Sequence, residues 1–103
     1  MPIYQTAHYQ VKASAVEKVK TAIQEFVAYL ETAEPGARLY WAWQQQEDPT
    51  RFVHIFGFAD EAAHERHGQS EAVRRFEAVY TPELVSQGVD FVDYNWIAGK
   101  HSK

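Results

Sequence analysis

Residues 52–59 constrain the fold more than any other segment of this 103-residue chain. Neither of the two alternating sets of side chains in this segment contains a charged residue. Successive side chains of a strand point to opposite faces, so a strand of this kind is covered on both sides. The segment predicts a central strand with one face formed by Phe52, His54, Phe56 and Phe58 and the other by Val53, Ile55, Gly57 and Ala59.

Three further strands are predicted from apolar alternation over residues 3–12, 38–46 and 89–97. In the first of them Ile3, Ala7, Tyr9 and Val11 share one face, and Tyr4, Thr6, His8 and Gln10 share the other. Residues 47–50 have the composition of a turn and are few enough to join two antiparallel neighbours.

Two helical regions are predicted from apolar residues spaced three and four apart. The first carries its apolar stripe over residues 16–30, and Ser14 with Glu17 has the pattern of a capping box. The second begins after Asp60 as N-cap and divides into two helices, of which the later one is capped by Ser70.

The resulting order is strand, helix, strand, strand, helix, strand, which is the ferredoxin-like βαββαβ arrangement of an α+β protein. It predicts one domain over residues 1–103, with a four-stranded antiparallel sheet, both helical regions on one face and a polar tail at 99–103. Both alternating sets of the later strands hold large side chains, with Trp41 and Trp43 opposite Tyr40, and Phe91 and Ile97 opposite Val92, Tyr94 and Trp96, so both faces of the sheet are apolar. Because such a face is costly to leave in water, we expect a homodimer that packs sheet against sheet.

Charge and composition exclude several classes of function. The net charge of −4 and scattered basic residues argue against nucleic acid as a partner. The chain contains no cysteine, which rules out disulfides, thiolate catalysis and sulfur-bound metals. No run of roughly 20 apolar residues and no leader-like N-terminus is visible, so no membrane partner is expected and the cytoplasm is the expected location.

Residues 52–76 resemble the antibiotic biosynthesis monooxygenase family. The shared features are a strand that leads into Asp60-Glu61-Ala62-Ala63, a histidine at His67, a small residue, and a second helix with an aromatic residue at Phe76. The first strand, around residues 7–12, is also similar to the opening strand of that family. The order of elements matches over nearly the whole chain.

The resemblance implies a dimeric α/β barrel with a pocket in each subunit between sheet and helices. Some members oxidise quinols or anthrones with molecular oxygen and use no metal, flavin or haem, whereas others degrade haem. The haem-degrading branch uses positions that align with His8, His67 and Glu77 here, and a glutamate is a poor axial ligand for haem iron. We therefore expect no cofactor.

Histidines are the candidate catalytic residues, because an imidazole can take a proton from a phenolic or enolic substrate near neutral pH. His64 and His67 lie one helical turn apart, and the resemblance suggests that His8 points into the same pocket. The alternative is that His64 and His67 lie on a solvated helix edge and that His8 is an ordinary sheet residue. His54 shares a face with phenylalanines, which indicates a core or interface residue.

Three aromatic side chains are the candidate substrate-binding residues: Trp43, Tyr80 and Phe58. Aromatic rings suit stacking on a flat substrate, although Trp43 could equally belong to a dimer core and Tyr80 could simply pack on the sheet. The two spaced histidines with His8 would form an imidazole set for a metal, but the sequence lacks a His-Glu-x-x-His pattern, and no metal is predicted.

These observations lead to the hypothesis of a cofactor-independent monooxygenase that oxidises a small quinol- or anthrone-type aromatic with molecular oxygen. The alternative is a non-catalytic dimer, ligand-binding or stress-associated, that uses the same pocket. A proton-transfer enzyme such as an isomerase would use a histidine in the same way, so this third interpretation also stays open.

Overall fold

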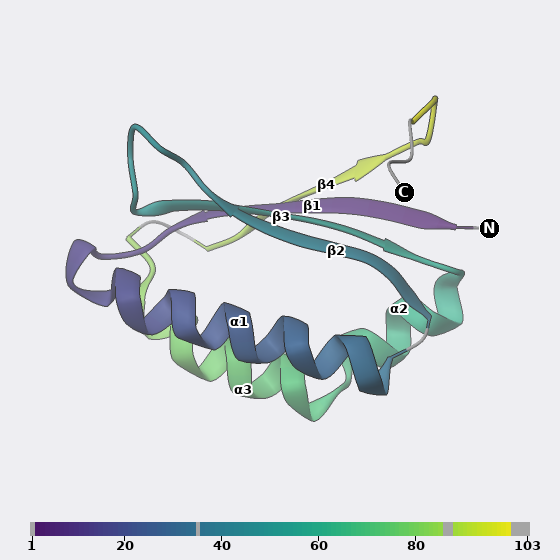
Figure 1. Cartoon of the computed structure of the whole chain (residues 1–103), viewed down its shortest axis with the longest axis horizontal. Coiled ribbons are helices and arrows are strands. Elements are labelled where there is room, and N and C mark those ends of the chain that lie inside the picture. Colours follow the sequence, from purple (N-terminus) through teal and green to yellow (C-terminus); the bar gives the residue numbers. More distant parts are fainter. Residues whose placement is uncertain (1, 35, 86–87, 100–103) are drawn as a thin grey trace.

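A four-stranded antiparallel sheet carries all of the helices on one face (Figure 1). The computed structural model describes residues 2–34, 36–85 and 88–99. The strand order is β2-β3-β1-β4, so the ferredoxin-like α+β prediction is confirmed. The elements are β1 (Ile3–Gln10), η1 (Ala13–Ala15), α1 (Val16–Ala33), β2 (Ala37–Gln44), β3 (Arg51–Phe58), α2 (Glu61–Gly68), α3 (Glu71–Tyr80), η2 (Thr81–Glu83) and β4 (Asp90–Tyr94).

The core lies between the sheet and the layer formed by α1 and α3. The buried stripe of α1 includes Val19, Ile23, Phe26 and Leu30, as its periodicity predicts. The ring of Phe26 stacks on that of Phe76 from α3, with centroids 5.1 Å apart and planes 8° from parallel. Burying such side chains contributes roughly 1.5–3 kcal/mol each, which fixes both helices on this face of the sheet.

None of the described helices covers the opposite face of the sheet (Figure 1). That face carries large apolar side chains. Trp41 and Trp43 are each 54% exposed, and their rings lie 5.7 Å apart on β2. Tyr94 and Trp96 are similarly exposed near the end of the chain. The prediction that both faces of the sheet carry large apolar side chains is therefore confirmed. We call this surface the open face, defined by Trp41, Trp43, Val92, Tyr94 and Trp96.

Two of the three predicted helix caps are present. Asp60 Oδ1 accepts a hydrogen bond of 2.9 Å from the backbone N–H of Ala63, and Ser70 Oγ accepts one of 3.2 Å from Val73. The cap predicted at Ser14 is wrong, because residues 13–15 form a 3₁₀ turn and Ala15 occupies the N-cap position of α1 without a side-chain bond. In that turn the N–H of Ala15 is already bonded to Lys12 O.

The limits of all four strands differ from those predicted, by only one or two residues at each end in β2 (predicted 38–46) and β3 (predicted 52–59). β1 ends at Gln10, and Val11 then forms an isolated bridge with Leu84. β4 covers only Asp90–Tyr94, so the predicted 89–97 is too long at both ends. Most of the predicted polar tail, residues 100–103, lies outside the described residues. Within the described part of the chain, no helix combines the length and apolar character that a bilayer crossing requires.

The capping pattern leads to a stability prediction. Asp60→Ala should lower the free energy of unfolding by about 1 kcal/mol, because the backbone N–H of Ala63 then loses its partner. Ser14→Ala is the matched control and should change it by less than about 0.5 kcal/mol. Urea unfolding of both variants measures the difference, and equal losses at the two positions would contradict the assignment.

Candidate functional site

A cavity of about 200 Å³ lies between the helix-facing side of the sheet and the helices. Its floor contains His54, whose neighbours across the sheet are Ala7 on β1 and Ala42 on β2. Because both neighbours carry only a methyl group, the sheet leaves room beside the imidazole that larger residues would fill. Aromatic rings form much of the wall, including Phe26, Tyr40, Phe56, Phe76 and Tyr80.

His54 is held at both ring nitrogens by tyrosine hydroxyl groups. Its Nε2 lies 2.7 Å from Tyr9 Oη and its Nδ1 lies 2.8 Å from Tyr40 Oη. His54 is 1% exposed, and its ring stacks on Phe76 with centroids 5.6 Å apart. The expectation that His54 is a core residue is confirmed, but the same residue also lines the cavity.

Burial keeps the hydrogen-bonded side chains of His54, Tyr9 and Tyr40 uncharged near neutral pH. Desolvation lowers the pKa of His54 to about 4, because the interior disfavours the imidazolium form. Desolvation also raises the pKa of Tyr9 and of Tyr40 far above the ordinary tyrosine value, with a further contribution from neighbouring tyrosine hydroxyls. The centre of the cavity therefore contains neutral hydrogen-bonding groups.

A second polar pair lies at the junction of α1 and α2. His67 Nδ1 lies 2.9 Å from Oε1 of Glu34, the C-cap residue of α1. The side chains are 11% and 13% exposed, respectively. Nδ1–H donates to the carboxylate, which leaves Nε2 as the ring nitrogen with a free lone pair. No described residue forms a hydrogen bond to Nε2, and His67 lines the cavity.

Two opposing effects act on the pKa of His67. Desolvation lowers it, whereas the hydrogen bond and charge of Glu34 raise it and the neighbouring His64 lowers it again. Desolvation is the largest effect, so the pKa of His67 lies below its ordinary value and the ring is neutral at pH 7. A neutral imidazole held by a carboxylate is the usual arrangement of a general base, because the carboxylate stabilises the imidazolium that forms.

The structure brings together three further residues that the sequence analysis selected. His64 and Tyr80 line the same cavity as His67. Phe58 is buried beneath the histidines, with its ring centroid 5.2 Å from His64 and 4.9 Å from His67. Phe58 therefore supports the two imidazoles instead of lining the cavity.

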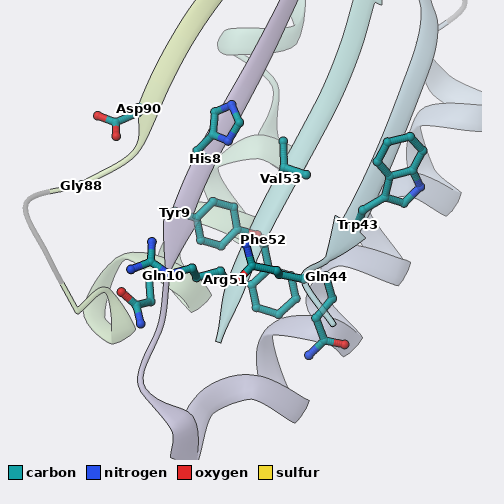
Figure 2. A pocket seen from close by; sticks show the side chains of 11 residues that line it. His8, Tyr9, Gln10, Trp43, Gln44, Arg51, Phe52, Val53, Gly88 and Asp90 are labelled. Carbon is teal, nitrogen blue, oxygen red and sulfur yellow. The ribbon is translucent and has the colours of Figure 1, made fainter. Parts of the chain in front are cut away.

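The expectation that His8 and Trp43 share this pocket is wrong. His8 is exposed, and its position in β1 turns it away from the side of Ala7 and Tyr9 (Figure 2). The pairing of the strands puts His8 and Trp43 on either side of Val53 on the open side of the sheet. They line a different hollow of about 410 Å³. This hollow is larger than the cavity under the helices, but three of its lining residues, His8, Arg51 and Asp90, are exposed to solvent.

Sequence reasoning missed three polar residues of the site: Tyr9, Tyr40 and Glu34. The one available signal for the tyrosines was a histidine inside an otherwise uncharged strand, since a buried imidazole requires hydrogen-bonding partners. Glu34 follows the apolar stripe of α1 and carries no pattern that marks it. Among the described residues, no three His, Cys, Asp or Glu side chains gather closely enough to hold a metal ion.

Comparison with known proteins identifies the family. The sequence profile described as antibiotic biosynthesis monooxygenase matches residues 2–79. The chain belongs to the antibiotic biosynthesis monooxygenase family. No curated protein matches it in sequence.

Several crystal structures share the fold of this family member. A protein from Bacteroides thetaiotaomicron has a TM-score of 0.89 at 17% identity, covering 99% of this chain and 96% of its own. A structure described as an antibiotic biosynthesis monooxygenase has a TM-score of 0.84 at 24% identity, covering 93% and 99%. The protein PA3566 from Pseudomonas aeruginosa has a TM-score of 0.82 at 27% identity, covering 94% and 95%.

The buried imidazole predicts a pH dependence of stability. The folded-state pKa of His54 is about 4, against 6.5 in an exposed histidine, so the unfolded chain binds the proton first as the pH falls. The stabilisation is fully present above pH 6.5 and is lost between pH 6.5 and 4, by about 3 kcal/mol. Urea unfolding at several pH values measures it.

His54→Gln is the control for that measurement, because an amide can bond to the tyrosines but does not titrate. The variant retains His67, whose lowered pKa acts in the same direction, so the difference between the two proteins isolates His54. Parallel stability curves for wild type and variant between pH 6.5 and 4 would contradict the assignment.

Proposed function

We propose that this protein is an oxygen-dependent monooxygenase that oxidises a small hydroxylated aromatic, of the quinol or anthrone type, without a bound cofactor. The substrate would lie in the cavity between the sheet and the helices. The observation that carries the proposal is the neutral His67, which lines an aromatic cavity and is oriented by the buried carboxylate of Glu34. Family membership over residues 2–79 supports monooxygenase chemistry in general.

The proposed reaction begins with proton transfer to His67 Nε2 from a phenolic or enolic hydroxyl group. The product is an electron-rich anion of the substrate, and the imidazolium is paired with Glu34. That anion supplies the electrons for oxygen. In an anthrone an activated CH₂ group becomes a carbonyl, and in a quinol a ring C–H becomes C–OH while the two hydroxyl groups are oxidised to the quinone. In both cases one oxygen atom enters the product and the other leaves as water. The substrate provides all four electrons, so the overall reaction needs no external reductant.

The wall of the cavity suits such a reaction. Phe26, Phe56 and Phe76 offer apolar faces to a flat ring and to molecular oxygen. A volume of about 200 Å³ is below the roughly 300 Å³ at which pockets for drug-sized ligands begin. We therefore expect a quinol of one or two fused rings to fit without rearrangement, whereas a three-ring anthrone would require the cavity to open. His64 lies beside His67 and is proposed to help orient the substrate.

Oxygen consumption with a panel of quinols and anthrones tests the proposal. With a substrate that the wild type turns over, His67→Gln should lower kcat/KM roughly 100-fold or more, because the general base is lost. Glu34→Gln should lower it roughly tenfold, since an amide still accepts from Nδ1–H but no longer stabilises the imidazolium. Glu34→Gln should also shift the acid limb of the pH profile to lower pH.

His8→Gln is the matched control, because it makes the same change on the other side of the sheet and should leave turnover within about twofold. Tight binding of the panel without oxygen uptake would favour the non-catalytic alternative. Isomerisation of a compound without oxygen uptake would favour a proton-transfer enzyme. Full activity in His67→Gln would remove His67 from the mechanism.

We also propose that a second copy of the chain covers the open face. Exposed rings of Trp41, Trp43, Tyr94 and Trp96 gather there, and covering each contributes roughly 1.5–3 kcal/mol. A twofold axis through this face lets the same patch cover itself. Pairing through the sheet would leave the cavity under the helices intact in each subunit.

Sedimentation measures this association. The wild type should sediment at about 24 kDa, twice the 11.9 kDa of one chain. Trp41→Glu/Trp43→Glu should give a folded monomer, because a dimer of this variant would bury carboxylates without partners. Tyr29→Glu is the control, since Tyr29 is an exposed aromatic residue on the helix side. A wild type that remains a stable monomer at micromolar concentration would refute the dimer.

A further inference from the structure

The hydrogen-bonded side chains of Tyr9, His54 and Tyr40 carry more polar hydrogen atoms than the two hydrogen bonds between them use. Each tyrosine hydroxyl carries one hydrogen and a neutral imidazole carries one N–H, so the chain holds three. Only two contacts use them, at 2.7 Å to Nε2 and 2.8 Å to Nδ1. One tyrosine must donate to the bare ring nitrogen, and the other accepts from the N–H. The accepting tyrosine therefore keeps a hydroxyl hydrogen to give elsewhere.

The position of the surplus hydrogen depends on the tautomer of His54. When Nε2 carries the hydrogen, Tyr9 accepts and has its own O–H to donate. When Nδ1 carries it, Tyr40 accepts and has the spare O–H instead. Within the described residues neither hydroxyl makes a second side-chain hydrogen bond, and both tyrosines line the cavity. The cavity thus contains one hydroxyl donor that can be presented from β1 or from β2.

We infer that this surplus hydroxyl hydrogen is donated to an oxygen atom of the ligand, so that Tyr9 and Tyr40 select aromatic compounds bearing a phenolate, enolate or carbonyl oxygen. The inference rests on the proposed function in taking this cavity as the substrate site. At ordinary pH neither tyrosine can act as a charged tyrosinate that accepts a hydrogen bond from the ligand, because burial raises both pKa values and keeps the hydroxyl groups protonated.

The donor complements the base proposed at the other polar pair. His67 would remove a proton from the substrate, and the resulting oxyanion needs a hydrogen bond in a site with little water. A tyrosine hydroxyl provides it without adding charge to a cavity in which His54 is neutral. An exchange of the His54 tautomer also lets the same site serve substrates whose oxygen lies nearer to either strand.

Equilibrium binding of 1-naphthol and naphthalene in anaerobic buffer tests the inference without relying on turnover. The two probes share a ring system, and only the first carries an oxygen. The wild type should bind 1-naphthol roughly tenfold more tightly, the value of about one hydrogen bond. Tyr9→Phe/Tyr40→Phe should bring the ratio close to one, whereas at least one of the single variants should keep most of it, because the remaining tyrosine can still present a donor.

Tyr29→Phe is the matched control, since the same hydroxyl is removed from an exposed residue outside this cavity and the ratio should not change. An unchanged ratio in the double variant, or no preference in the wild type, would overturn the inference. The inference would survive if the ratio falls as expected but no compound on the panel consumes oxygen, although the monooxygenase proposal would then fail.

A second measurement avoids dependence on the folding of the double variant. Nitrogen-15 spectra of wild-type His54 should show a neutral ring whose two nitrogen signals move apart on addition of 1-naphthol, because the ligand favours one tautomer. Naphthalene should leave them in place. Ring signals that do not respond to 1-naphthol at saturation would contradict the assignment on their own.

Discussion

A buried imidazole needs hydrogen-bonding partners at both ring nitrogens, and this requirement ties the sheet register to the cavity. An unpaired polar group inside a protein costs about 1–3 kcal/mol, so His54 is tolerable in β3 only where two donors or acceptors reach it. Tyr9 and Tyr40 do so from the strands on either side. A slip of one residue in either pairing would turn the tyrosine to the other face of the sheet. The strand register therefore determines both the shape of the cavity and the hydrogen bonds of His54 within it.

The same burial divides the site into two chemically different halves. The centre contains uncharged groups, because desolvation holds the pKa of His54 to about 4 and keeps the tyrosines protonated. The end near α2 contains an imidazole–carboxylate pair, His67 with Glu34. Proton uptake is favoured at this second position, since only there does a carboxylate stabilise the cation. Donation without charge is favoured at the first.

The sequence allowed the fold to be predicted because one-sided apolar periodicity and helix caps report local structure directly. Alternation in the first strand also assigned His8 to the side opposite Ala7 and Tyr9, which the structure confirms. The wrong expectation that His8 shares a pocket with His67 came from the family resemblance, against that pattern. Trp43 was misplaced for a similar reason, since an aromatic residue suits a substrate slot and an exposed sheet face equally well.

The polar partners could not be predicted, because they depend on distances between elements that no single segment encodes. A period of two shows which residues share a face but not which residue lies opposite another, so the convergence of Tyr9 and Tyr40 on His54 was invisible. The position of Glu34 depends on where the last turn of α1 meets α2 in the folded chain. One histidine in an uncharged strand indicates that hydrogen-bonding partners are required, but it does not identify which residues provide them.

The break between α2 and α3 explains how the cavity gains side chains from both helices. Gln69 and the cap at Ser70 separate them, so each helix sets its own direction over the sheet. α2 brings His64 and His67 to the cavity while α3 brings Phe76 and Tyr80. A continuous helix would present one stripe along a single line and would cover a narrower strip of the sheet. The separate caps thus let a short chain surround one small cavity with both a proton acceptor and an aromatic wall.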